Sequence, residues 1–264
     1  MVSRWSLNTG LPKVPDALQG VWSKIDRAYE HLETYEDLLP DFRKSQPCSW
    51  ASEIDPDTND KVWRVTGHPT APPFHWNVVI GDCHYNFRSS LDHLAWQLVL
   101  IHGNTPTRST AFPLFQTPSD WKRFSPARLK GIGSKAVALI EQTQPCFGSN
   151  TYRNKILGWL DGLHNVDKHR HFNLTIAGTM GGFWHPGLPV RASTEVFIHE
   201  GPVENGTELA RVPEKYAYVE FTPALDIAFG NGTSAAGEGI LGLLIGIREV
   251  LARIILPQFY AFFP

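Results

Sequence analysis

Four residues that could bind a ligand or transfer a proton lie close together in the stretch Gly81–His102. His84, Arg88 and Asp92 follow one another at intervals of four residues, and His93 comes next. Side chains four residues apart share one face of a helix, so we expect Arg88 and Asp92 to form an ion pair. The rest of the stretch is mostly apolar, and polar groups are costly to bury unless they are paired. The pattern predicts a polar site on a buried helix.

A second apolar stretch, Ile156–Leu174, has the same character and is expected to pack against the first. Its polar groups include His164, Asp167, Lys168, His169 and Arg170. The C-terminal end of a helix attracts cations, which by itself accounts for Lys168 and Arg170. His164 and Asp167 instead follow buried leucines toward the interior. We therefore expect one polar cleft between the two helices. A purely structural alternative is that the ion pair and a hydrogen-bonded histidine only fix how the helices pack.

Arg88 and His93 have the spacing R-x-x-x-x-H, which resembles the motif of the HEPN superfamily of helical domains. That superfamily includes metal-independent endoribonucleases. The resemblance implies that His93 deprotonates or orients a ribose 2′-hydroxyl and that Arg88 holds the scissile phosphate. It also implies a homodimer in which two motifs share a cleft. The chain departs from the superfamily in its greater length, in its expected sheet and in Ser89, where Asn, Asp or His is common.

On this interpretation the partner is RNA and no cofactor is needed. Asp92 and Asp167 would orient Arg88 and a histidine, and Lys168 or Arg170 would add positive charge. The candidate catalytic residues are thus Arg88, His93, Asp92 and His84, and the candidate binding residues are Lys168, Arg170, Asp167, His164 and His169.

Two other chemistries fit the same residues. His164, Asp167 and His169 offer nitrogen and carboxylate ligands of the kind that a divalent transition metal prefers, which would give a metal-dependent hydrolase or oxygenase. Alternatively, the cations Arg88 and Lys168, set among aromatic residues, would bind a small anionic or aromatic ligand without turnover. Metal analysis and RNA cleavage in EDTA separate the three possibilities.

Longer blocks resemble a widespread group of uncharacterised bacterial proteins. The group shares approximately G-D-x-x-H-N-x-R-S-x-L-D-H-L and, later, D-K-H-R. This chain has GDCHYNFRSSLDHL and DKHR, with Tyr85 between His84 and Asn86. The resemblance covers most of the chain and implies the positions of the site and a bacterial cytoplasmic setting.

Composition excludes several classes of protein. The 264 residues are 42% hydrophobic and 19% charged, as in a folded globular protein, and the net charge of -2 gives no overall attraction to nucleic acid. Three cysteines without C-x-x-C spacing favour a reducing compartment such as the cytoplasm. We see no signal peptide, and the apolar segment Ile240–Leu256 contains Arg248, Glu249 and Arg253, so we predict no membrane association.

Periodicity predicts an α+β fold, in which four or five helices form a bundle and the second half of the chain forms an antiparallel sheet. Residues 1–15 are expected to form an arm and residues 16–264 a single domain. Strands are expected at Lys61–Gly67 and His75–Ile80, with a surface loop at Gln46–Asp60 and a helix that begins at Gly81-Asp82. Five further strands are expected between Phe172 and Gly230, followed by a terminal helix from about Ala235 to Leu256.

Overall fold

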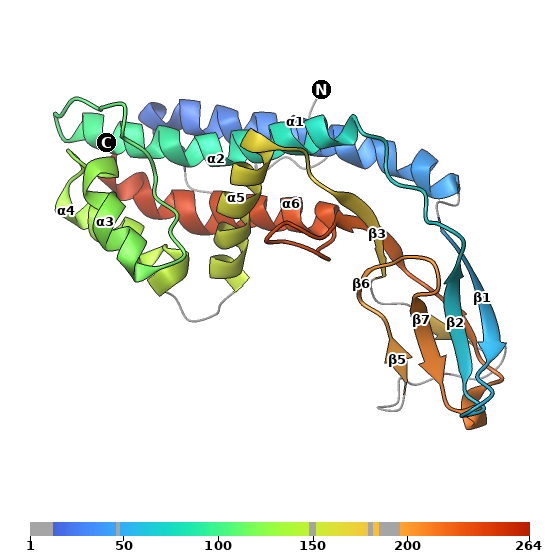
Figure 1. Ribbon diagram of the computed structural model, residues 1–264. Helices are drawn as coiled ribbons and strands as arrows, with labels where there is room; N and C mark the ends of the chain where they lie inside the picture. The colour runs from blue at the N-terminus through green and yellow to red at the C-terminus, as the bar shows by residue number, and fades with distance from the viewer. Residues whose placement is uncertain (1–12, 46–47, 148–151, 179–181, 185–195) are drawn as a thin grey trace. The chain divides into compact units, whose positions relative to one another are not determined.

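The computed structural model describes residues 13–45, 48–147, 152–178, 182–184 and 196–264, and it has the predicted α+β fold (Figure 1). The predicted N-terminal arm lies mostly outside the described residues. Packing divides the chain into two compact units. One consists of Met1–Glu33, Ile80–Lys168 and Leu244–Pro264, and the other of Thr34–Val79 and His169–Leu243. Each unit is assembled from stretches far apart in the chain.

The two apolar stretches that the sequence singled out are helical in the structure over residues 81–101 and 156–169. The α-helices are α1 (Gln19–Lys44), α2 (Trp76–Ile101), α3 (Pro118–Arg128), α4 (Ser134–Gln142), α5 (Tyr152–His169) and α6 (Ile240–Glu249). After α6 the chain continues as a π-helix, Val250–Ile255, and a 3-10 helix, Leu256–Phe262. Helices α3 and α4 are separate because the chain between them turns at Gly131, which takes a left-handed φ of 88°. No helix in the described part of the chain combines the length and apolar character that a membrane span requires.

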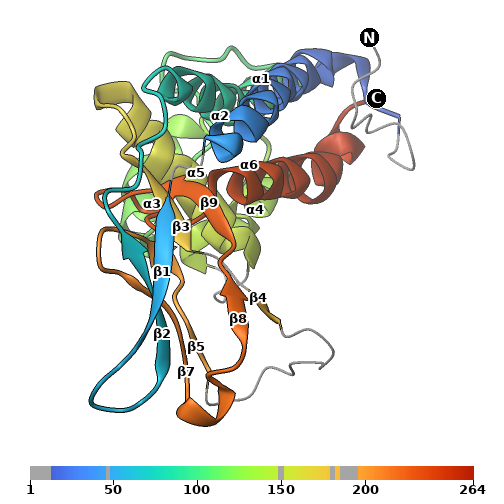
Figure 2. The ribbon, with the colours of Figure 1, turned by 90° about the vertical axis from the view of Figure 1, so that its right-hand side faces the viewer.

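The first unit is a helical bundle in which α5 packs against both α6 and α2. The unit's parts of α1 and α2 lie side by side (Figures 1 and 2), and the Cys83 thiol donates to the carbonyl of Ala28 at 3.2 Å. A Cβ on Gly246 of α6 would come within 3.0 Å of Ile156 in α5. At the other end of α5, Asp167 lies against Gly81 of α2. The two helices that the sequence singled out, α2 and α5, therefore do pack together.

Helix α2 begins five residues earlier than predicted, so the expected strand at His75–Ile80 and the helix break at Gly81-Asp82 are wrong. The apolar run fits a helix because the backbone turns helical directly after two prolines, with the Trp76 amide donating to the Pro73 carbonyl at 3.0 Å. Gly81 is inside the helix, where it serves close packing. A Cβ there would overlap the Asp167 carboxylate, with its Cγ only 3.0 Å away.

The second unit contains antiparallel sheets. One has the order β1-β2-β7-β5, a second β6-β3-β9, and β4 pairs with β8. The strands are β1 (Ser49–Ile54), β2 (Lys61–Thr66), β3 (Leu174–Gly178), β4 (Gly182–Trp184), β5 (Phe197–Ile198), β6 (Gly201–Pro202), β7 (Glu208–Val212), β8 (Glu220–Thr222) and β9 (Leu225–Phe229). The second half of the chain supplies most strands, as predicted. The loop predicted at Gln46–Asp60 is wrong at β1, whose six residues are all exposed and therefore lack the apolar alternation of a half-buried strand.

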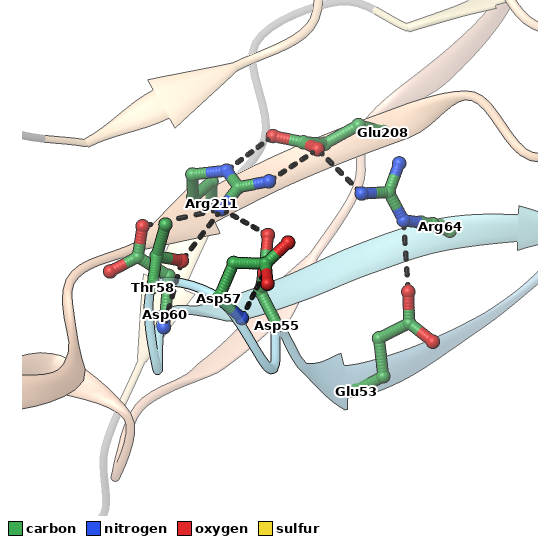
Figure 3. Close-up of polar contacts among 8 residues, drawn as sticks. All are labelled: Glu53, Asp55, Asp57, Thr58, Asp60, Arg64, Glu208 and Arg211. Atoms are coloured by element: carbon green, nitrogen blue, oxygen red, sulfur yellow. Dashed lines mark hydrogen bonds and ion pairs between the residues drawn. The ribbon is translucent and has the colours of Figure 1, made fainter.

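A network of charged groups fixes the β1–β2 hairpin to β7 (Figure 3). The Arg211 guanidinium donates to Glu208 at 2.8 Å and, across the sheet, to Asp55 at 2.8 Å and Asp60 at 3.3 Å. The bond from Arg211 holds the pKa of Asp55 below its ordinary value. Arg64 extends the network by pairing with both Glu53 and Glu208 at 2.9 Å. Ion pairs and hydrogen bonds thus stabilise the edge of the sheet at β1, where no apolar side chains are buried.

We expect Gln144 to be essential for the stability of the first unit. Its fully buried side chain amide accepts from the Phe115 amide at 3.1 Å and donates to the Pro113 carbonyl at 2.9 Å. Gln144→Ala leaves both backbone groups without these partners and should lower the free energy of unfolding by about 2–4 kcal/mol. Denaturant unfolding measures this, with exposed Gln142→Ala as the matched control. Equal stabilities for the two variants would contradict the role of Gln144.

Candidate functional site

Arg88 is buried and held by two acceptors. It is 6% exposed, and it donates to Asp92 at 2.8 Å and to the Phe112 carbonyl at 2.6 Å. The Phe112 amide donates in turn to the same oxygen of Asp92, at 2.9 Å. The ion pair predicted from the spacing is therefore present, and the segment after α2 completes it. Asp92 is left in a fixed position at the edge of the buried region.

Helix α5 brings a second set of ionisable groups to the same region. Burial raises the pKa of Asp161, and the positive charges of Arg88, Arg128 and Lys168 act against that shift. Asp161 was not among the predicted site residues, although the sequence places it seven residues before Lys168, on the same helix face. The electrostatic coupling of Arg88 with Asp161 joins α2 and α5 into one polar cluster.

His164 lies in the interior of this cluster. It is 7% exposed, its ring centre is 6.3 Å from that of Tyr85, and its Nδ1 has no hydrogen-bond partner in the described part of the chain. Burial lowers its pKa to about 4, and the positive charges of Lys168 and Arg88 act in the same direction. His164 is therefore an uncharged histidine at neutral pH.

His84 is enclosed completely within the first unit. Its Nδ1 lies 3.0 Å from the Ile80 carbonyl one turn earlier in α2, and burial lowers its pKa to about 4. It is 0% exposed, so it contributes to packing and not to a surface that a substrate reaches.

His93 does not share the side of α2 that carries Arg88. Five residues along a helix correspond to a rotation of about 140°, and His93 is exposed where Arg88 is buried. His93 lies beside α1, since a Cβ on Gly20 would be 3.6 Å from its Nδ1. Burial and the charge of Lys24 lower the pKa of His93, and the charge of Asp92 raises it.

A pocket of about 340 Å³ opens beside His93. It is lined by Asp92, His93, Trp96 and Gln97 of α2 and by Thr110 of the following loop. The Trp96 side chain is 46% exposed and offers an aromatic face. Asp92 thus connects the buried Arg88 to a pocket that contains an uncharged histidine. The sequence did not predict this pocket, because Thr110 comes from a segment outside the helix.

The remaining predicted residues lie at the end of α5 and directly after it. Lys168 is exposed and Asp167 is half-buried against Gly81. His169 and Arg170 belong to the second unit, where Arg170 donates to the Gly232 carbonyl at 2.7 Å. Among the residues that the structure describes, no three or more His, Cys, Asp or Glu side chains are arranged to hold a metal ion. His164, Asp167 and His169 thus do not form such a group.

No family model, curated protein or solved structure matches this chain. The HEPN resemblance and the resemblance to the bacterial group therefore stay predictions. Any function therefore has to be inferred from the positions of the residues around Arg88 and His93.

We expect removal of the Arg88 side chain to destabilise the protein strongly. Arg88→Met leaves the Phe112 carbonyl and the Asp92 carboxylate without their charged partner, and should lower the free energy of unfolding by about 2–4 kcal/mol. Arg27→Met is a matched control, because Arg27 pairs with Glu30 at an exposed surface. It should change the free energy of unfolding by less than about 0.5 kcal/mol. A loss for Arg88→Met as small as for the control would show that the buried pair is not structural.

Acid should destabilise the protein through its buried histidines. His84 and His164 have pKa values of about 4 in the folded chain against 6.5 ordinarily, so the unfolded chain binds more protons between those values. Their contribution to the free energy of unfolding is complete above pH 6.5. It is lost as the pH falls toward 4, by up to about 1.4 kcal/mol per pH unit for each histidine. The raised pKa of Asp161 acts with the opposite sign.

The variant His164→Gln isolates one of these histidines. Its free energy of unfolding, measured by denaturant titration at several pH values, should fall less steeply between pH 6.5 and 4 than that of the native chain. The exposed His75 provides the control variant His75→Gln. An unchanged slope in His164→Gln would show that His164 is not buried in its neutral form.

Proposed function

We propose that the first unit is a metal-independent endoribonuclease whose reacting group is His93. The observation that carries the proposal is the position of His93 in a pocket beside Asp92, which Arg88 and the Phe112 amide hold in place. A neutral histidine next to a fixed carboxylate is suited to accept a proton, because the carboxylate stabilises the imidazolium that forms.

In the proposed reaction, His93 takes the proton of a ribose 2′-hydroxyl. The 2′ oxygen then attacks the adjacent phosphorus, the bond to the 5′ oxygen breaks, and that oxygen takes a proton from water. The products are a 2′,3′-cyclic phosphate and a 5′-hydroxyl. Trp96 supports this assignment, since an exposed aromatic ring is a surface on which an unpaired base can stack.

In this proposal Lys24, and not Arg88, contacts the phosphate. Arg88 is 6% exposed and already bound to two acceptors, so its role is to position Asp92. The Lys24 ammonium lies 3.4 Å from Asn86 Oδ1 and 5.6 Å from the Tyr85 ring centre, and its charge acts on His93. Its positive charge, which acts on His93, would also favour a phosphate bound beside that histidine.

Two further parts of the proposal follow from the resemblance and from the cysteines. A homodimer would bring two His93 pockets to one cleft, which light scattering tests. A cytoplasmic setting agrees with the three free thiols of Cys48, Cys83 and Cys146.

A second candidate function is binding of a small aromatic ligand without turnover. The observation that favours it is the exposed ring of Trp96 in the lining of the pocket. Saturable binding of uridine 3′-monophosphate, followed by NMR, together with intact RNA after prolonged incubation, would support this candidate over cleavage.

His93→Ala should lower the rate of RNA cleavage by about a hundredfold or more, because it removes the proton acceptor. The measurement is cleavage of a labelled single-stranded RNA in EDTA, with detection of the cyclic phosphate. In the native protein the rate should rise with pH through an apparent pKa below 6.5 and then level off, because the pKa of His93 is lowered from its ordinary value and its neutral form is the active one.

The control is His68→Ala, purified identically, because His68 is exposed and lies in the second unit. Equal cleavage by both variants would refute the role of His93 and indicate a contaminating nuclease. Cleavage that occurs only without EDTA would favour the metal-dependent alternative.

A further inference from the structure

The second unit contains a pocket of about 400 Å³ that the proposed nuclease site does not use. Its walls come from the C-terminal end of α1, from β1 and the residue before it, from β3, and from β9 and the turn before it. The side chains that bear on its chemistry are Phe42, Arg43, Cys48, Trp50, Ile176 and Asp226. Such a volume and a mainly apolar lining are usual for sites that bind small molecules.

The apolar walls are flat and firmly supported. The Phe42 ring packs edge-on against Trp76, with ring centres 5.3 Å apart. Trp50 is 39% exposed, so part of its ring is open to a ligand. Ile176 of β3 is buried and forms the floor together with residues of β9. A planar, apolar body therefore fits this space better than a highly hydrated one.

One acid and one base give this pocket its polar groups. Arg43 Nη2 donates to Asp226 Oδ1 at 3.3 Å, and the Ile227 amide donates to the same oxygen at 2.8 Å. The rest of the carboxylate and of the guanidinium keeps further acceptor and donor positions. Burial raises the pKa of the Cys48 thiol, so this thiol adds no charge to the lining. The positive charge of Arg43 and the negative charge of Asp226 therefore balance one another.

The hydroxyl of Tyr35 is a further polar group on which the charges of Asp226 and Arg43 act. Tyr35 is completely buried, and its hydroxyl has no hydrogen-bond partner among the described residues. Burial raises its pKa, and the charges of Asp226 and Arg43 act on it. The hydroxyl thus stays protonated, as a donor close to the same charged pair.

We propose that this pocket binds a neutral, planar molecule through an amide or lactam edge. Such an edge carries one N–H and one C=O side by side, which complements a carboxylate acceptor and a guanidinium donor that are themselves adjacent. A charged ligand is disfavoured, since an anion would meet Asp226 and a cation would meet Arg43. The proposal concerns residues of the second unit alone and does not depend on the nuclease proposal.

Benzamide is the probe, and benzoate and benzylamine, which share its ring, are the charged comparators. Calorimetry measures affinity, and the shift of the Trp50 indole signal in NMR locates the binding. We expect benzamide to bind more tightly than either comparator and to move the Trp50 signal. Asp226→Asn keeps the shape and the bond from the Ile227 amide but loses an acceptor, and should weaken benzamide binding about tenfold or more.

Asp57→Asn is the matched control, because Asp57 is an exposed carboxylate of the same unit outside the pocket lining. It should bind benzamide like the native protein, and thermal melting of both variants checks that they fold. The proposal is overturned if Asp226→Asn folds and binds benzamide unchanged, if either charged comparator binds best, or if benzamide does not bind at millimolar concentration.

Discussion

A buried guanidinium that cannot lose its charge is the constraint from which the first unit is best understood. Arginine stays protonated in proteins, so a fold that buries Arg88 must supply acceptors for it. The carboxylate of Asp92 is one acceptor, and the Phe112 carbonyl is the other. The chain after α2 therefore has to return to the helix. Gln144 fixes that return by bonding to the backbone at Pro113 and Phe115.

This arrangement gives α2 two sides with different chemistry. One side meets α5, and there Arg88, Asp161 and His164 share a region where burial shifts the pKa values of the latter two. The other side carries His93 and the pocket beside Trp96. Asp92 belongs to both, because one of its oxygens is held by Arg88 while its side chain lines the pocket. Arg88 thus fixes the position of a carboxylate that lines a surface pocket.

The second unit is stabilised differently. Its edge strand β1 is exposed throughout, and the charged groups around Arg211 and Arg64 tie it to β2 and β7 (Figure 3). Charges on an edge strand also disfavour pairing with other chains. The pocket of this unit combines apolar walls with a balanced acid–base pair, a different ligand environment from the His93 pocket.

The sequence by itself determined whatever depends on local spacing. The apolar period specified α5 and α2 from residue 81 onward, the interval of four residues specified the Arg88–Asp92 pair, and alternation specified β2, β7 and β9. Tertiary structure decided the groups that come from distant segments: the Phe112 carbonyl on Arg88, Lys24 and Thr110 near His93, and Asp161 in the buried cluster. It also decided β1, which has no apolar face, and the position of Gly81, which serves close packing inside a helix instead of marking where the helix begins. The physical reason is that periodicity records which face of an element is buried, whereas a hydrogen bond across the fold leaves no regular spacing in the chain.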